Sequence, residues 1–162
     1  MLTAEHLISA YARNLTFIKQ LTAGFTHADS LIQPPIQGNC ANWVVGHILA
    51  YRNRILTILD ETTVVDDTIA ARYARDSKPV LGDELGLGQF PAMVAALELA
   101  QDRLAAGMRG MTPEQGEQIF SFGQFSMPAA EWMLFLLRHE AYHTGQLELL
   151  QEVVKTAKQD PG

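Results

Sequence analysis

The stretch RHEAYHTGQ at residues 138–146 places two histidines, His139 and His143, four positions apart. Side chains at positions i and i+4 of a helix lie on the same face, one above the other. Apolar residues continue this face on both sides of the pair, namely Trp132, Leu136, Leu147 and Leu150. Two imidazole rings on a buried helix face can direct their nitrogens at one point, and a shared metal ion is the commonest reason for such an arrangement.

A third histidine, His47, lies in a second strongly apolar segment, NWVVGHI at residues 42–48. It is the natural third ligand, and we predict a metal site formed by His47, His139 and His143. The alternative is that each ring hydrogen-bonds a neighbouring group and binds no metal, because buried polar groups need partners. The two other histidines, His6 and His27, are expected at the surface, at the two ends of the first helix.

Polar residues near the three histidines are expected to orient their rings. Gln146 is the strongest candidate because it lies three positions after His143, on the same helix face. Tyr142 is a further candidate. Glu140 is another, although it lies one residue away from the ligand face, where exposure to solvent is the alternative.

Three more residues lie within two helical turns of His47. Tyr51 and Arg54 follow it on the same face and have the chemistry to contact an anionic substrate. The alternative, which we favour, is a core tyrosine and an arginine that extends to solvent. Cys40 precedes His47 by about two turns, and we expect an inert thiol rather than a ligand.

Composition indicates one domain over residues 1–157 with a frayed tail at 158–162. The chain has 162 residues, 48% of them hydrophobic and 19% charged, which is enough for a full core. The net charge of −6 and the absence of any lysine or arginine cluster argue against binding to nucleic acid or to an anionic membrane surface. A single cysteine, no apolar run of about 20 residues and no signal-peptide pattern lead us to expect a cytoplasmic protein without disulfides.

The spacing of apolar residues predicts an all-α fold, a four-helix bundle. The expected helices cover residues 3–28, 41–60, 91–108 and 128–155. Residues 61–89 read as a long crossover with a short helix near 68–75, long enough to let the second and third helices run parallel. The alternation of apolar and polar residues at 119–122 predicts a short extended segment, a lip or a small hairpin beside the bundle.

The two histidine-containing segments, 42–48 and 138–146, together resemble the DinB/YfiT-like superfamily of metal-dependent enzymes, and FGQF at 122–125 is also similar to its pattern. The resemblance covers nearly the whole chain. It implies an up-down-down-up bundle with parallel second and third helices. It also implies a divalent ion near one end of the core, held by His47, His139 and His143, and often a homodimer.

Three neutral imidazoles suit zinc or nickel, with iron or manganese possible if carboxylates join the ligand set. Three protein ligands leave a coordination position open, which is the catalytic pattern. Characterised relatives include transferases and isomerases that use low-molecular-weight thiols. The resemblance therefore implies a thiol-dependent S-transferase, or a hydrolase, that acts on a small molecule. The alternative is a non-catalytic, metal-stabilised bundle that acts through dimerisation in a stress response.

Overall fold

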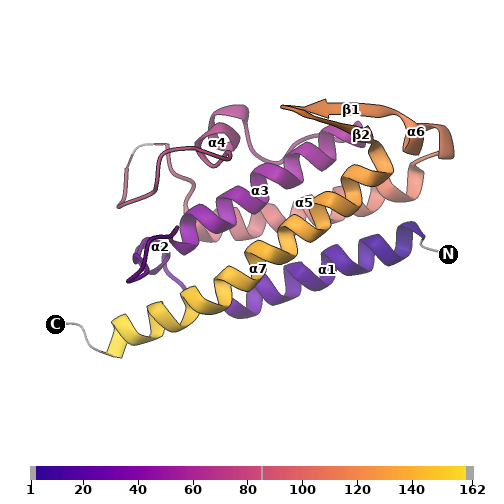
Figure 1. The fold of residues 1–162 in the computed structure, drawn as a ribbon. Coiled ribbons are helices and arrows are strands. Elements are labelled where there is room, and N and C mark those ends of the chain that lie inside the picture. The colour runs from indigo at the N-terminus through magenta and orange to yellow at the C-terminus, as the bar shows by residue number, and fades with distance from the viewer. Residues whose placement is uncertain (1–2, 85, 160–162) are drawn as a thin grey trace.

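Four long helices form the frame of the protein, and the computed structural model describes residues 3–84 and 86–159. These helices are α1 (Ala4–Leu21), α3 (Ala41–Ile58), α5 (Phe90–Gly110) and α7 (Ala129–Gln159), and they lie side by side (Figure 1). The shorter elements are α2 (His27–Ser30), α4 (Asp67–Arg72), α6 (Pro113–Glu117), β1 (Ile119–Phe122) and β2 (Phe125–Pro128). The chain is thus mostly helical, as predicted, with one small sheet in addition.

The helices bury their apolar stripes against one another in a closed arrangement. Helix α3 packs against α5 and α7, and α1 packs against the same two helices from the other side. Every residue from 41 to 50 is buried. Most of these residues are apolar, as expected of a helix segment that neighbours cover on all sides.

The first helix is shorter than predicted, because the chain turns after Leu21. Gly24 adopts φ +75°, a left-handed conformation that glycine accepts without strain, and α2 then starts at His27. His27 therefore does not end the first helix, and its side chain is only 17% exposed. Its Nδ1 accepts a hydrogen bond from the Phe90 N–H at 3.2 Å. His6 is exposed, as expected.

The crossover between α3 and α5 contains the predicted short helix and is fixed to α3 by specific contacts. Tyr73 is fully buried and lies over Gly46, where a Cβ would meet its ring at 2.4 Å. The Tyr73 hydroxyl donates to Asn42 Oδ1 at 2.7 Å and accepts the Gly88 N–H at 2.9 Å. The glycine on α3 thus makes room for the residue that holds the crossover in place.

Residues 119–128 form the small hairpin that the sequence suggested. Strands β1 and β2 pair antiparallel, and Gly123 in the connecting turn has φ +62°. The indole N–H of Trp132 donates to the Phe120 carbonyl at 2.9 Å, which attaches the hairpin to the start of α7. The hairpin is therefore held beside the end of the helix that carries two of the predicted ligands.

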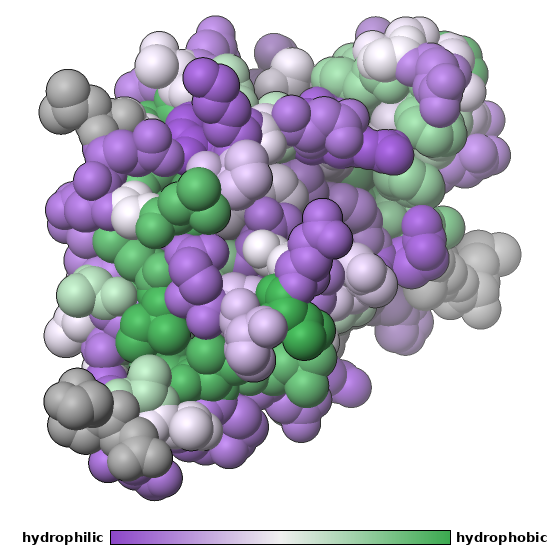
Figure 2. All heavy atoms as spheres, turned by 60° about the vertical axis from the view of Figure 1, so that its left-hand side comes forward, coloured by the Kyte–Doolittle hydropathy of each residue, from purple (hydrophilic) through white to green (hydrophobic). Residues whose placement is uncertain are grey.

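Helix α7 continues through Lys158 and Gln159, which the sequence placed in a frayed tail, and residues 160–162 lie outside the described residues. Lys158 pairs with Asp29 of α2 at 2.8 Å. Hydrophilic side chains cover most of the face shown in Figure 2, with hydrophobic residues gathered between them. In the described part of the chain, no helix has both the length and the hydropathy that a membrane span requires.

Candidate metal centre

The three predicted ligand residues converge on one small volume between α3 and α7. The Nε2 atom of His139 lies 3.3 Å from Nε2 of His47 and 3.2 Å from Nε2 of His143. One nitrogen from each ring lies within 4.8 Å of the other two. Residues 92 positions apart in the chain are thus brought together by the packing of two helices.

The ring of His47 is held in one orientation by groups on both of its sides. It stacks on Trp43, with ring centroids 4.4 Å apart and an interplanar angle of 16°. Its Nδ1 lies 2.6 Å from the Tyr73 carbonyl, which can only accept, so Nδ1 carries the hydrogen and donates it. The Nε2 lone pair of His47 therefore points at the other two rings.

His143 is oriented in the same way by Gln146, the residue predicted for that role. Its Nδ1 donates to Gln146 Oε1 at 2.8 Å, which leaves its Nε2 free as an acceptor or ligand. The third ring, His139, has no such support, since its buried Nδ1 finds no hydrogen-bond partner among the described residues. Two of the three rings are thus fixed in the tautomer that a metal ligand requires.

The surroundings keep the three imidazoles neutral. Burial lowers the pKa of His47 to about 4, and the His143 ring and the Arg54 charge act in the same direction. Burial, together with the neighbouring histidines and arginines, lowers the pKa of His139 to about 3. Burial also lowers the pKa of His143. A neutral imidazole is the form that binds metal, because protonation occupies the ligand lone pair.

Two of the nitrogen separations fit a tetrahedral divalent ion. Zinc–nitrogen bonds of about 2.0–2.1 Å at tetrahedral angles place neighbouring ligand nitrogens about 3.3–3.4 Å apart. The two Nε2 separations of 3.2 and 3.3 Å are close to that spacing. A cation between these atoms would also offset the repulsion between lone pairs that face one another. The donor set is therefore positioned to hold a metal ion.

The cluster forms part of the wall of a cavity of about 840 Å³. All three histidines line it, so an ion bound to them would be reachable from solvent. Half of the remaining lining residues are aromatic, and most of the others are polar or charged. Trp43 and Trp132 are buried and also form part of this lining.

Tyr51 packs against the hydrophobic core, as we favoured from the sequence, and it also lies beside the histidines. The Tyr51 ring lies 4.6 Å from the His47 ring and 4.3 Å from the His139 ring, centroid to centroid, and also lines the cavity. Arg54 is half-buried, and its Cζ lies 4.4 Å from the centre of the Tyr51 ring. Both residues therefore belong to the candidate site. Tyr142 also lines the cavity but is 64% exposed.

Glu140 neither contacts the histidines nor faces solvent. It is 4% exposed and forms two hydrogen bonds of 2.9 Å with Arg52, which is fully buried. Sequence reasoning missed both Arg52 and Tyr73. An arginine in an otherwise apolar helix was the signal for the first, whereas nothing local marked Tyr73. Cys40 is buried beside the Val80 carbonyl, and burial raises the pKa of its thiol, as expected for an inert cysteine.

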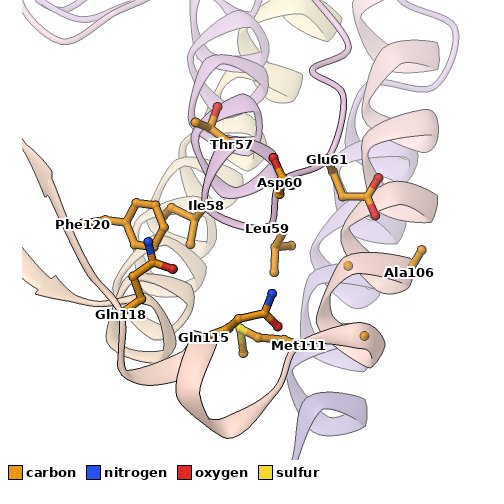
Figure 3. A pocket seen from close by; sticks show the side chains of 12 residues that line it. Thr57, Ile58, Leu59, Asp60, Glu61, Ala106, Met111, Gln115, Gln118 and Phe120 are labelled. Carbon is orange, nitrogen blue, oxygen red and sulfur yellow. The ribbon is translucent and has the colours of Figure 1, made fainter.

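A second hollow, of about 470 Å³, lies between the ends of α3 and α5 and the base of the hairpin (Figure 3). Its charged lining residues are Asp60 and Glu61, and no histidine or cysteine lines it. In the described part of the chain, the one group of three residues positioned to share a metal is the histidine cluster. The larger cavity, which the three histidines line, is therefore the candidate metal site.

The family model of the DinB superfamily matches residues 5–147 of this chain. That range includes the four long helices, apart from Ala4 at the start of α1 and the last turns of α7, and all three histidines of the cluster. The chain therefore belongs to the DinB superfamily, as its sequence indicated. No curated protein matches it.

Proposed function

We propose that this protein is a metal-dependent enzyme whose ion is held by His47, His139 and His143. One observation carries the proposal: three imidazole nitrogens converge on the wall of an aromatic cavity, with two of the rings fixed by hydrogen bonds on their far side. A closed structural site would have a fourth protein ligand, whereas this one has room for a substrate or water. Zinc or nickel suits three neutral imidazoles, and no carboxylate belongs to the cluster in the described chain.

The reaction that we favour is the transfer of a small thiol to an electrophile, with hydrolysis as the variant. A bound divalent ion acts as a Lewis acid, lowering the pKa of a thiol or water or polarising a carbonyl. The Tyr73 carbonyl and Gln146 keep the rings of His47 and His143 in place, and aromatic side chains line the cavity beside them. The substrate is a small molecule, in keeping with the cavity volume.

Membership of the DinB superfamily supports this proposal. It also supports a particular topology of the four long helices. We infer an up-down-down-up bundle in which α3 and α5 run parallel. Asn42 near the start of α3 contacts Gly88 just before α5, and Leu59 at the end of α3 lies against Gly107 near the end of α5. The crossover of residues 59–89 then returns the chain to the end where α3 began.

A non-catalytic, metal-stabilised bundle that acts as a homodimer in a stress response is the second candidate. It is favoured by large apolar side chains on the outside of α7, where Leu134, Tyr142 and Leu149 are 44%, 64% and 70% exposed. This candidate predicts bound metal, a dimer in solution and no reaction with thiols. Sedimentation analysis together with a thiol-transfer screen of the metal-loaded protein separates the two.

Elemental analysis of the protein, purified without a histidine tag, tests the metal site. We expect one divalent ion per chain and a lower melting temperature after chelation, because binding to the folded state alone stabilises it. His143→Ala should reduce metal affinity at least tenfold, with His6→Ala as the exposed control. Unchanged metal content in the His143 variant would exclude the three-histidine site.

A further inference from the structure

Arg54 is a half-buried cation without a partner in the wall of the histidine cavity. Its guanidinium Cζ lies 4.4 Å from the centre of the Tyr51 ring and 5.5 Å from that of Phe122. Among the described residues, none accepts a hydrogen bond from it or forms an ion pair with it. By contrast, Arg52 and Arg109 each pair with a carboxylate. The five N–H donors of Arg54 are thus available to a ligand.

The position of this cation relative to the histidines is fixed by a shared neighbour. The Tyr51 ring lies within 4.6 Å of both the His47 and His139 rings, and Arg54 packs against the same ring. Packing between two aromatic rings also limits the rotamers of the arginine. An anion bound to its guanidinium would therefore be held at a defined place next to the three Nε2 atoms.

The charges of the cavity wall favour a negative ligand, although the protein carries a net charge of −6. Arg54 and Arg75 both line the cavity. The one carboxylate in the lining is that of Asp76, which is exposed and lies 3.7 Å from the Arg75 guanidinium. Phe122, Phe125 and Phe135 also line this cavity, and the Phe122 ring lies next to Arg54.

We propose that Arg54 is a carboxylate-binding residue and that the substrate is a small carboxylic acid with an apolar, preferably planar, body. The carboxylate accepts hydrogen bonds from the guanidinium, since the planar fork of arginine matches the two oxygens. The body of the ligand lies between the aromatic rings, and its far end reaches the histidine cluster. This assignment of a substrate class rests on the proposed enzymatic function of the same site.

A direct test compares phenylacetate with phenylacetamide, which has the same shape and no charge. Binding is measured by calorimetry on the full-length protein, both metal-free and zinc-loaded, because zinc itself attracts carboxylates. In both forms we expect the wild type to bind phenylacetate at least tenfold more tightly than phenylacetamide. The reason is that hydrogen bonds to a charged carboxylate are stronger than hydrogen bonds to a neutral amide. Arg54→Gln should remove this preference, and Arg54→Lys should retain part of it.

Arg109→Gln is the control, an arginine outside the cavity that pairs with Glu5, and it should leave the preference unchanged. Circular dichroism and zinc content show whether the Arg54 variants fold and keep the metal site. An equal preference for the carboxylate in wild type and both Arg54 variants, or no preference in wild type, would overturn the assignment. If instead the wild type binds no metal, the proposed enzymatic function fails, while the metal-free titration still decides the role of Arg54.

Discussion

At the scale of single residues, one buried ion pair, between Arg52 and Glu140, supports the arrangement of the three histidines without including any of them. Arg52 directs hydrogen bonds to Glu140 on α7, to Gln101 and the Leu97 carbonyl on α5, and to the Tyr11 carbonyl on α1. All five guanidinium donors are used, and one side chain on α3 thereby contacts the other three long helices. Because Glu140 directly follows His139, this pair also fixes the rotation of α7 that turns His139 toward His47.

Removing one member of this pair should be strongly destabilising. Glu140→Ala would leave the Arg52 charge buried without a counter-ion, which costs about 3–5 kcal/mol in comparable sites. We expect the double variant Arg52→Met, Glu140→Leu to recover most of that loss, because two apolar residues leave no charge to solvate. Urea unfolding in the presence of a chelator measures the free energy of unfolding of the single and the double variant. Glu5→Ala, which breaks the exposed pair with Arg109, is the control and should change stability little.

A separate prediction about metal affinity follows from the hydrogen bond between His143 and Gln146. Gln146→Leu should weaken metal binding by about 10- to 100-fold, since the ring loses the acceptor that fixes its tautomer and orientation. Competition with a chromogenic chelator gives the affinity. Gln151→Leu, further along α7, is the control. Equal affinities in the two variants would mean that helix packing alone positions His143.

At the scale of elements, the contact between α3 and the crossover couples the fold to the site. Tyr73 sits in the space left by Gly46, one residue before His47, and its own carbonyl holds the His47 ring. A side chain at position 46 would therefore displace Tyr73 of the crossover, and the shifted Tyr73 carbonyl would change the orientation of the His47 ring. The absence of a side chain at this one position is thus a condition for the observed ring orientation.

We accordingly expect Gly46→Ala to destabilise the protein by about 1–3 kcal/mol and to weaken metal binding, because the Cβ would meet the Tyr73 ring at 2.4 Å. Gly145→Ala on α7 is the matched control. A Cβ there has nothing within 4 Å, so higher helix propensity should stabilise by up to about 1 kcal/mol. Thermal melting and the chelator assay measure both variants. A stable, metal-binding Gly46 variant would show that Tyr73 does not fix His47.

The elements differ in how well the sequence predicted them. The long helices α3, α5 and α7 lie within a few residues of their predicted ranges, because apolar spacing and breaker residues are local signals. The pairing of Arg52 with Glu140 joins residues 88 positions apart, and that of His47 with Tyr73 joins residues 26 apart. No local spacing encodes such contacts. The three histidines that converge could therefore be picked out from the sequence, whereas most of the groups that hold their rings could not.

At the scale of the whole molecule, the burial that keeps the histidines uncharged also makes the folded protein sensitive to acid. The pKa of His47 is lowered to about 4 and that of His139 to about 3, mainly by burial, against an ordinary value of 6.5. As the pH falls from 6.5 toward about 4, His47 and His139 take up protons in the unfolded chain but stay neutral in the folded protein. The unfolded state then binds more protons, so lowering the pH favours unfolding.

We therefore expect the free energy of unfolding of the metal-free protein to be highest above pH 6.5 and to fall as the pH drops toward about 4. His47 alone should account for a loss of about 2 kcal/mol between pH 7 and pH 5. His47→Gln lacks this group, so its stability should fall less over the same interval, while His6→Gln, altered at an exposed position, should follow the wild type. Urea titrations at pH 7, 6 and 5 in the presence of chelator give these slopes. Parallel curves for wild type and His47→Gln would show that the folded protein accepts a proton at His47 as readily as the unfolded chain, and the neutral-ligand description of the centre would then be wrong.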